Sequence, residues 1–395
     1  MNRVGASAVA LVSLLLLGAE DQPPTPDYAA DARSIERLVN EDYAYLDRLE
    51  GGQLPLSARL RAEGERVASR DDLIRYAERA LMALADHHAI TGASLADSWA
   101  LVPSYADLWI ERRGAEYIIT AVREGSPAEQ AQVTAGDRLI AAGAMPIEQA
   151  VEMFWADLGL TVTDERAGYA ARVIAAGRRS TQRALTVAHE DATPQALVLP
   201  NLYAVQRRES APLVTSVEGT VLTIRFNDSL GDAATIAAFD EAMARARPDQ
   251  AIVLDLTDTA SGGNTSIARG IMGWFVDRPT NYQVHAIPAE ERQSGVARQW
   301  IEQVLPRAGK HHSGPVTVRV GRWTGSMGEG LAVGFDAVGA KVEGGPMAGL
   351  LGAIYDYELD QSGLVIKFPV ERLFHVDGTP RERFVPAAIA RPRSD

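Results

Sequence analysis

Two stretches near the beginning of the chain carry apolar residues at the spacing of amphipathic helices, in residues 30–50 and again in residues 57–90. The apolar residues of one face are Ile35, Val39, Tyr43 and Leu46 in the first stretch, and Leu73, Ala77, Leu81 and Leu84 in the second. A polar, Pro-rich segment precedes them. We therefore predict a linker and a helical region within residues 20–98, in which the helices end on Asp86-His87-His88.

From about Tyr105 the pattern changes to the alternation of β-strands, first in the segments LWIE, EYIITAV and GDRLIAA. A polar, Arg-rich interval at residues 161–183 separates these from two further predicted strands, RALTVAHE and ALVLP. Gly125 and Gly136 lie where turns need a positive φ. The order strand, Gly-Ser-Pro-Ala, short helix, Gly-Asp, strand resembles a PDZ domain over residues 105–200, which implies peptide binding at a sheet edge. The alternative is an unrelated small β domain.

Beyond about Val214 predicted strands and helices alternate along the chain. Strands are predicted in the segments TVLTIRF, AIVLDL, VTVRV and AKVEG, and a helical pattern follows each of the first three. In the helix that begins at Asn264, the apolar residues from Ile267 to Phe275 fall on one face, as expected for a helix that covers a sheet. The pattern therefore predicts an α/β core over residues 214–395.

Composition excludes several kinds of chemistry. The 395 residues include no cysteine, which excludes disulfides, thiolate metal sites and a cysteine nucleophile. A net charge of −13 disfavours nucleic acid as a partner, because binding to a phosphate backbone needs a basic surface. No zinc-type cluster is evident. We therefore expect neither a metal nor another cofactor.

The first 19 residues have the composition of a secretory signal peptide. Arg3 supplies a short positive region, an apolar run extends from Val4 to Leu17, and Gly18-Ala19 precede acidic residues. Leu17 fits the −3 position of a cleavage after Ala19 poorly, so an uncleaved membrane anchor and a buried N-terminal helix are the alternatives. We expect a periplasmic or secreted protein without membrane contact after cleavage.

Ser326 lies between a predicted strand, VTVRV, and a predicted helix. A serine at a strand-to-helix turn is well placed as a nucleophile, because the Met327 N–H in the first turn of the helix is free to bind an oxyanion. The same residues also read as a capping box, since Glu329 follows Ser326 by three positions, and a capping box requires no catalysis.

A Gly-Gly turn follows another predicted strand of the core. Asp255-Leu256 end this strand, and Gly262-Gly263 come soon after, at the carboxyl end where open α/β sheets bind ligands. Two glycines allow the backbone to approach a substrate closely and to point an N–H at it. The alternative is a plain loop before a helix.

Taken together, these motifs resemble the C-terminal processing (tail-specific) serine peptidase family. The resemblance rests on the Asp-Leu to Gly-Gly segment, on Ser326 to Glu329, on Asp86-x-His88, and on the PDZ-like module between them, so it covers nearly all of the mature chain. It implies an α/β fold, with a crotonase-like α/β peptidase core, an N-terminal helical region and an inserted PDZ-like β domain. It further implies Ser326 as nucleophile, with Gly262, Gly263 and Met327 around the oxyanion.

The general base departs from one branch of this family. The tail-specific branch uses a lysine in a turn that here reads EGGPMAGLLGA, and the three lysines of the chain lie elsewhere. The chain is thus closer to the tricorn-type branch, which implies His88 as the base and Glu371, in FPVERLF, as its acidic supporter. An unperturbed imidazole would lose activity near pH 6.5. Glu329 is a second acidic residue that either supports the base or only caps its helix. The other histidines considered as bases are His87, His312 and His375.

The sequence therefore predicts an exported serine peptidase that cleaves peptides or unfolded proteins through an acyl-enzyme on Ser326. A second hypothesis is a catalytically inactive protein that binds peptides or hydrophobic ligands on the same scaffold. A third, a crotonase-like acyl-CoA enzyme, does not explain the PDZ-like module. The sequence does not indicate the oligomeric state.

Overall fold

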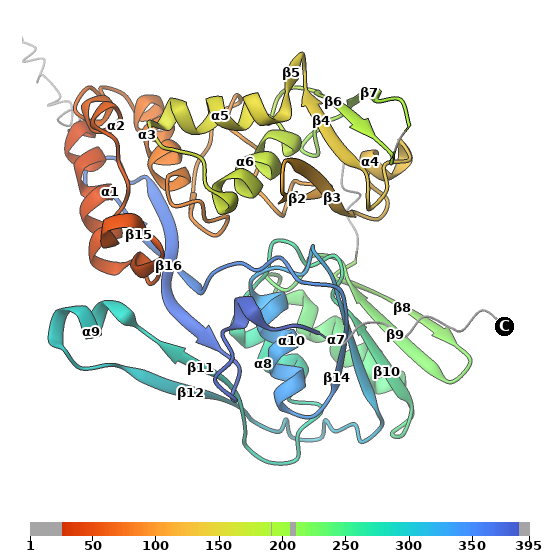
Figure 1. Cartoon of the computed structure of the whole chain (residues 1–395). Helices are drawn as coiled ribbons and strands as arrows, with labels where there is room; N and C mark the ends of the chain where they lie inside the picture. Colours follow the sequence, from red (N-terminus) through yellow and green to blue (C-terminus); the bar gives the residue numbers. More distant parts are fainter. Residues whose placement is uncertain (1–25, 191, 206–210, 387–395) are drawn as a thin grey trace, which may run out of the picture.

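The computed structural model describes residues 26–190, 192–205 and 211–386. Within them the chain forms a helical N-terminal region, a β-rich module and an α/β core (Figure 1). The predicted signal peptide, residues 1–19, lies outside the described residues. No helix in the described ranges combines the length and the apolar character that crossing a membrane requires.

The spacing of apolar residues predicted helical stretches at residues 30–50 and 57–90, and the second of these contains two helices and ends in a short strand, so the N-terminal region has three helices. They are α1 (Tyr28–Asp42), α2 (Ala58–Gly64) and α3 (Arg70–Met82), with 3-10 turns at Leu46–Arg48 and Glu50–Gly52. Asp27, Ser57 and Ser69 cap the three helices, because each side chain accepts a hydrogen bond from a first-turn backbone N–H. The helices lie beside the C-terminal strand β16 (Val365–Phe374), to which the short strand β1 (Ile90–Thr91) pairs antiparallel (Figure 1).

The module that follows is an antiparallel sheet of order β2-β3-β4-β6-β7, with β5 paired to β4. Its strands are β2 (Leu108–Arg113), β3 (Glu116–Val122), β4 (Arg138–Ala142), β5 (Met145–Pro146), β6 (Arg183–Ala188) and β7 (Gln195–Leu199). Its helices are α4 (Pro127–Gln130), α5 (Ile147–Leu158) and α6 (Asp164–Ala176).

Helix α6 lies in the polar, Arg-rich interval at residues 161–183, in which the sequence pattern predicted no element. Thr163 caps this helix, whose Ala and Val residues are buried. Trp155 of α5 donates a hydrogen bond from its indole N–H to the carbonyl of Arg166 in α6, at 2.9 Å. The tertiary contact with α5 therefore secures a helix that the charged composition concealed.

The core sheet has the order β14-β13-β10-β9-β8, in which the first four strands are parallel and β8 pairs antiparallel with β9. Its strands are β8 (Leu213–Glu218), β9 (Val221–Phe226), β10 (Ala251–Asp255), β13 (Val316–Val320) and β14 (Lys341–Gly344). Its helices are α7 (Ala234–Arg245), α8 (Thr265–Met272) and α10 (Met327–Ala337). This arrangement confirms the predicted repeat of strand and helix.

A second sheet joins the N-terminal region to the core, in the order β1-β16-β11-β12 with β15 paired to β16. Its remaining strands are β11 (Thr280–Ala286), β12 (Gln299–Val304) and β15 (Ala353–Glu358), and α9 (Pro288–Ser294) connects β11 to β12. A 3-10 turn, η3 (Arg381–Arg383), follows β16. The sequence pattern predicted none of the five strands of this sheet.

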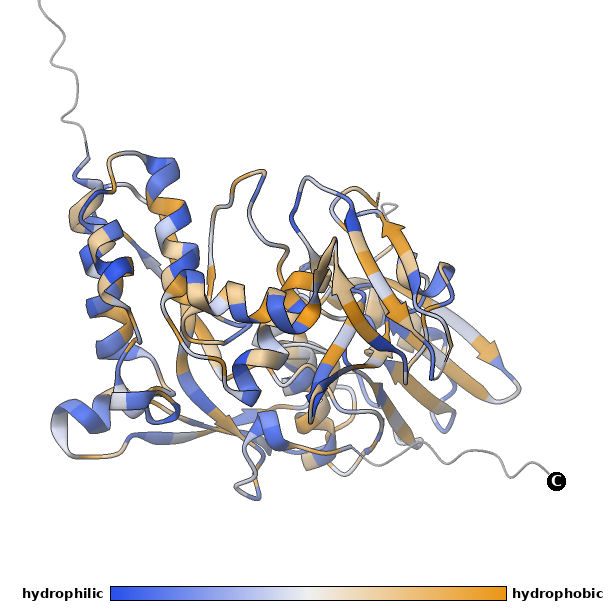
Figure 2. Ribbon diagram, turned by 45° about the horizontal axis from the view of Figure 1, so that its top comes forward, coloured by the Kyte–Doolittle hydropathy of each residue, from blue (hydrophilic) through white to orange (hydrophobic). Residues whose placement is uncertain are grey.

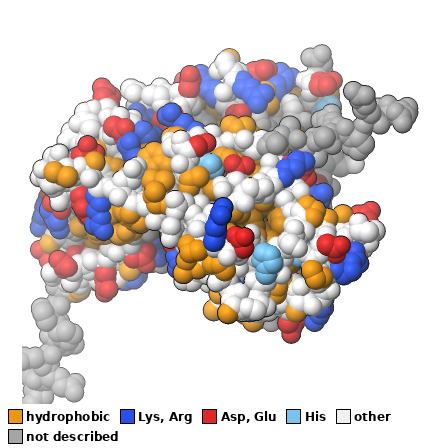
Figure 3. Space-filling model, turned by 90° about the horizontal axis from the view of Figure 1, so that it is seen from below, with side chains coloured by type: hydrophobic (Ala, Val, Ile, Leu, Met, Phe, Trp, Pro, Cys, Tyr) orange, Lys and Arg blue, Asp and Glu red, His pale blue; other side chains and the backbone are white. Residues whose placement is uncertain are grey.

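The described residues bury two hydrophobic clusters. One is shared by the N-terminal helices, the module and β16, and the other lies within the α/β core. Figure 2 shows the apolar segments in the strands and on one side of the helices, whereas Figure 3 shows acidic and basic side chains interspersed with apolar ones on the face seen from below. Trp323 and Leu351, from loops of the core, belong to the first cluster. These loops therefore lie where the two clusters meet.

Candidate active site

Ser326 occupies the tight connection between β13 and α10. Its backbone has φ 50° and ψ −112°, a conformation that residues with a side chain rarely adopt. Such a conformation costs about 1–3 kcal/mol and persists only where the surroundings enforce it, most often at functional sites. The side chain is half-buried. The turn therefore presents the Ser326 hydroxyl under strain at the start of a helix.

His88 lies in the turn between α3 and β1, and the fold brings it to Ser326 from 238 positions away. The distance between His88 Nε2 and Ser326 Oγ is 3.0 Å. The backbone N–H of His88 donates to Asp86 Oδ1 at 2.9 Å, and the Tyr43 hydroxyl donates to Asp86 Oδ2 at 2.9 Å. Asp86 is thus a support for the backbone of this turn rather than a partner of the imidazole.

The second imidazole nitrogen decides which tautomer His88 adopts. Its Nδ1 lies 2.6 Å from the backbone carbonyl oxygen of Leu351, which only accepts hydrogen bonds. The proton of a neutral His88 is therefore on Nδ1, and Nε2 presents its lone pair to the Ser326 hydroxyl. This is the tautomer that a general base needs.

Glu371 does not support His88, which corrects the prediction from the sequence. Its buried carboxylate, on β16, accepts hydrogen bonds from His285 Nδ1 at 2.6 Å and from the Tyr355 hydroxyl at 2.5 Å. The Leu351 carbonyl takes the place on His88 that was expected for an acidic residue. A backbone carbonyl leaves no mark in the sequence, so the motifs did not reveal it.

The surroundings of His88 favour its neutral form. Burial and the nearby positive charge of Arg381 lower the pKa of His88 to about 4, although hydrogen bonds with the Leu351 and Gly352 backbone act in the opposite direction. The ordinary value of about 6.5, expected from the sequence alone, is therefore too high. His88 remains able to accept a proton throughout the neutral and mildly acidic range.

The Gly262-Gly263 turn lies directly against Ser326. Gly262 has φ +68°, and a Cβ atom there would lie 2.5 Å from Ser326 Cβ and 3.1 Å from the Met327 nitrogen. Within the described ranges the backbone N–H groups of Gly263 and Met327 have no hydrogen-bond acceptor. These two donors suit an oxyanion formed beside Ser326. The turn is linked to the serine loop because the Gly325 N–H donates to the Thr259 carbonyl at 3.2 Å.

Glu329 connects the serine turn to the segment that orients His88. Its fully buried carboxylate accepts hydrogen bonds from the backbone N–H groups of Ser326 and Gly349, both at 2.8 Å, and of Leu350 at 3.3 Å. Burial raises the pKa of Glu329 to about 7, although Arg381 and these backbone donors lower it. The capping interaction predicted for Glu329 is present, and it extends to the neighbouring loop.

The other residues considered as bases lie in separate environments. His87 Nε2 accepts a hydrogen bond from Arg172, His312 Nε2 contacts the Gln250 carbonyl, and His375 contacts Asp377. The three lysines form ion pairs, Lys310 with Asp240, Lys341 with Glu343 and Lys367 with Asp356. In the part of the chain that the structure describes, no group of three or more metal-ligating side chains is placed to hold a metal ion.

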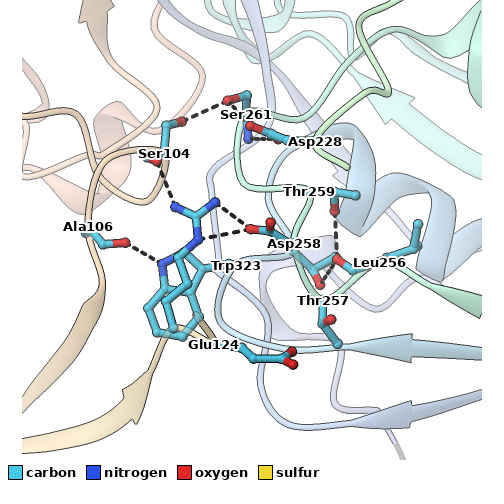
Figure 4. Close-up of polar contacts among 12 residues, drawn as sticks. Ser104, Ala106, Glu124, Asp228, Leu256, Thr257, Asp258, Thr259, Ser261 and Trp323 are labelled. Carbon is cyan, nitrogen blue, oxygen red and sulfur yellow. Dashed lines mark hydrogen bonds and ion pairs between the residues drawn. The ribbon is translucent and has the colours of Figure 1, made fainter. Parts of the chain in front are cut away.

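Several contacts fix the module against the loops of the active site (Figure 4). Arg123 of the module donates from Nε to Asp258 at 2.9 Å, just after β10. The Trp323 indole N–H donates to the Ala106 carbonyl at 2.7 Å, just before Ser326. A cavity of about 490 Å³ lies at this junction, lined by these three side chains and by residues of β2, β3 and the core loops. Ser326 itself does not line it.

The edge strand β2 is covered by α6, which bears on the predicted binding of a peptide to a sheet edge. Arg172 of α6 donates from Nη1 to the Ile110 carbonyl of β2 at 3.0 Å and from Nε to His87 at 2.9 Å. This helix therefore packs against the edge at which a peptide strand would add. The opposite edge of the sheet, β7, is formed by residues 195–199.

Comparison with known proteins relates this architecture to solved structures. A photosystem II D1 C-terminal processing protease is 15% identical, with a TM-score of 0.54, and the match covers 92% of this chain and 93% of the other. Mature CPAF is 12% identical, with a TM-score of 0.57 and coverage of 91% and 92%. No family model and no curated protein matches the sequence. The chain thus has the mixed α/β fold of C-terminal processing peptidases over most of its length, as the motifs implied.

Proposed function

We propose that the protein is a serine peptidase that cleaves peptides or unfolded proteins through an acyl-enzyme on Ser326, with His88 as the general base. The observation that carries this proposal is the contact of 3.0 Å between Ser326 Oγ and His88 Nε2, in a histidine whose Nδ1 is bound to the Leu351 carbonyl. The shared fold with a C-terminal processing protease supports it. We further propose that the first 19 residues direct the protein to the periplasm or the exterior.

In the first step Ser326 Oγ attacks the carbonyl carbon of a peptide bond while its proton passes to His88 Nε2. The carbonyl oxygen becomes an oxyanion, which the N–H groups of Met327 and Gly263 stabilise. His88 then gives the proton to the leaving amine, and the C–N bond breaks. A water molecule, deprotonated by His88, hydrolyses the resulting ester and releases Ser326 with its proton.

The proposal is tested by a fluorophosphonate probe and by cleavage of an unfolded protein. Ser326→Ala should abolish labelling and reduce cleavage by about 10⁴-fold or more, because no other group supplies the nucleophile. Ser69→Ala is the matched control, since Ser69 caps α3 away from the site. It should cost about 1 kcal/mol of stability and leave labelling intact. Equal labelling of Ser326→Ala and wild type would refute the assignment, and a folded wild type that neither labels nor cleaves would favour a binding protein.

A further inference from the structure

The carbonyl that orients His88 belongs to a segment without regular secondary structure, between β14 and β15. Residues of a strand are held by a hydrogen-bonded ladder, whereas Leu351 depends on contacts made by its neighbours. Gly352 is one constraint, because it has φ +48° and a Cβ atom there would lie 2.0 Å from the Glu371 carbonyl oxygen. Whatever fixes this segment also fixes the direction of the His88 imidazole.

Arg381 makes the contacts that hold the segment. Its side chain extends from η3, beyond the last strand, and the residue is only 3% exposed. Nη2 donates hydrogen bonds to the Leu350 carbonyl at 2.9 Å and to the Gly352 carbonyl at 2.8 Å. One guanidinium nitrogen therefore binds the carbonyls on both sides of Leu351, while the Leu351 carbonyl itself faces His88.

A second buried side chain, the carboxylate of Glu329, binds the backbone N–H groups of the same segment. Glu329 accepts hydrogen bonds from Gly349 and Leu350 and also from the backbone of Ser326. The segment thus lies between a carboxylate that binds its donors and a guanidinium that binds its acceptors. Hydrogen bonds to charged groups are about twice as strong as neutral ones, so this arrangement fixes the segment rigidly.

We propose that Arg381 is a positioning residue for the general base, which it orients by holding the two carbonyls that flank Leu351. This inference rests on the proposed function of His88 and assigns a role to a residue that binds backbone carbonyls rather than the nucleophile. The positive charge of Arg381 has a second effect, because it disfavours the imidazolium form. The other titratable groups that face His88, Arg381 or their partners are Glu329, Asp86, Tyr43, Tyr45 and Glu382.

The test compares Arg381→Met, Arg381→Lys and the control Arg383→Met, which alters an exposed arginine of the same 3-10 turn. Arg381→Met should lower kcat by about 10²-fold with little change in KM, because a displaced base slows the chemical step. Its acid limb of activity should move to higher pH, because a buried imidazole without the neighbouring cation is easier to protonate. Arg381→Lys retains a cation and donors, so it should recover the acid limb and part of kcat. Arg383→Met should behave as wild type.

The His88 imidazole is also titrated by NMR in each folded variant, which needs no activity. An upward shift of the His88 pKa in Arg381→Met, reversed in Arg381→Lys, is the expected result. An unchanged pKa together with unchanged kcat in Arg381→Met would overturn the inference. Failure of the wild type to label would instead refute the proposed function, and the NMR titration would still show whether Arg381 acts on His88. If Arg381→Met does not fold, Arg381→Lys decides the question. For this variant we expect kcat to fall tenfold or less and the pKa of His88 to be unchanged.

Discussion

The imidazole of His88 lies among groups that favour its neutral form and leave one nitrogen free. Burial and Arg381 oppose protonation, and the Leu351 carbonyl keeps the proton of the neutral ring on Nδ1. A base with a low pKa is weaker than one matched to neutral pH, but it is fully deprotonated over a wider range. At the scale of the residue, the site therefore favours availability of the base over its strength.

This balance predicts the pH dependence of labelling. The pKa of His88 in the folded protein is depressed to about 4, so its accepting form is present above that value and is lost as the pH falls through it. We expect protonation of His88 to halve the rate of fluorophosphonate labelling near pH 4, whereas a separate change near pH 7 would report Glu329, whose pKa is raised to about 7. Circular dichroism at each pH would confirm that the protein remains folded. An NMR titration of His88 with a midpoint near 6.5 would show that the imidazole is exposed to water and would contradict its burial.

At the scale of the element, the turn after β10 brings its glycines close to the start of α10. Gly262 combines a positive φ with a near contact to Ser326, so a side chain is excluded there for two reasons. Ser326, on the other side of this contact, also has a positive φ. The two turns therefore fit each other only in this arrangement.

Gly262→Ala tests this fit. A methyl group would lie 2.5 Å from Ser326 Cβ, so it should displace the nucleophile and reduce labelling by about 10²-fold. Gly219→Ala is the control, because Gly219 has φ +59° in the turn between β8 and β9 and open space around its Cβ position. Gly219→Ala should lose about 1 kcal/mol of stability through backbone strain, Gly262→Ala should lose more because of the added contact with Ser326, and only Gly262→Ala should lose labelling. Urea unfolding and labelling rates measure the two effects, and equal labelling of both variants would exclude the proposed contact.

At the scale of the whole molecule, the site lies where the two hydrophobic clusters meet. His88 comes from the N-terminal region, Ser326 and the Gly-Gly turn from the core, and the module contacts the loops that carry them. The C-terminal part contributes Arg381. Movement of any of these parts relative to the others would separate groups that act together.

The ion pair between Arg123 and Asp258 links the module to the core, and its coupling free energy measures the strength of this link. Arg123 is 8% exposed, so a double-mutant cycle to alanine should give a coupling free energy of about 1–3 kcal/mol. The exposed pair Arg245–Glu241, within α7, is the control and should give about 0.5 kcal/mol or less. Asp258→Ala should also slow labelling, because the same loop leads to Gly262. A coupling no larger than that of the control would mean that this contact does not hold the module in place.

The sequence by itself determined the local features of this protein. Hydrophobic spacing predicted the N-terminal helices and the strand-helix repeats of the core, since these patterns are set by neighbours a few positions apart. The order of motifs predicted that His88, Ser326 and Gly262 would converge, and they do. The pattern predicted no element at α6, which is held by a contact with α5.

Only the tertiary structure decided how the base is held and how readily it takes a proton. The acceptor on His88 is a backbone carbonyl 263 positions away, so no side-chain motif could identify it, and the acidic residue chosen by position, Glu371, binds His285 instead. The depressed pKa of His88 likewise depends on burial and on Arg381, which lies far along the chain. Sequence spacing specifies which face of an element is buried, whereas the contacts that orient and titrate a buried group arise only when distant segments pack together.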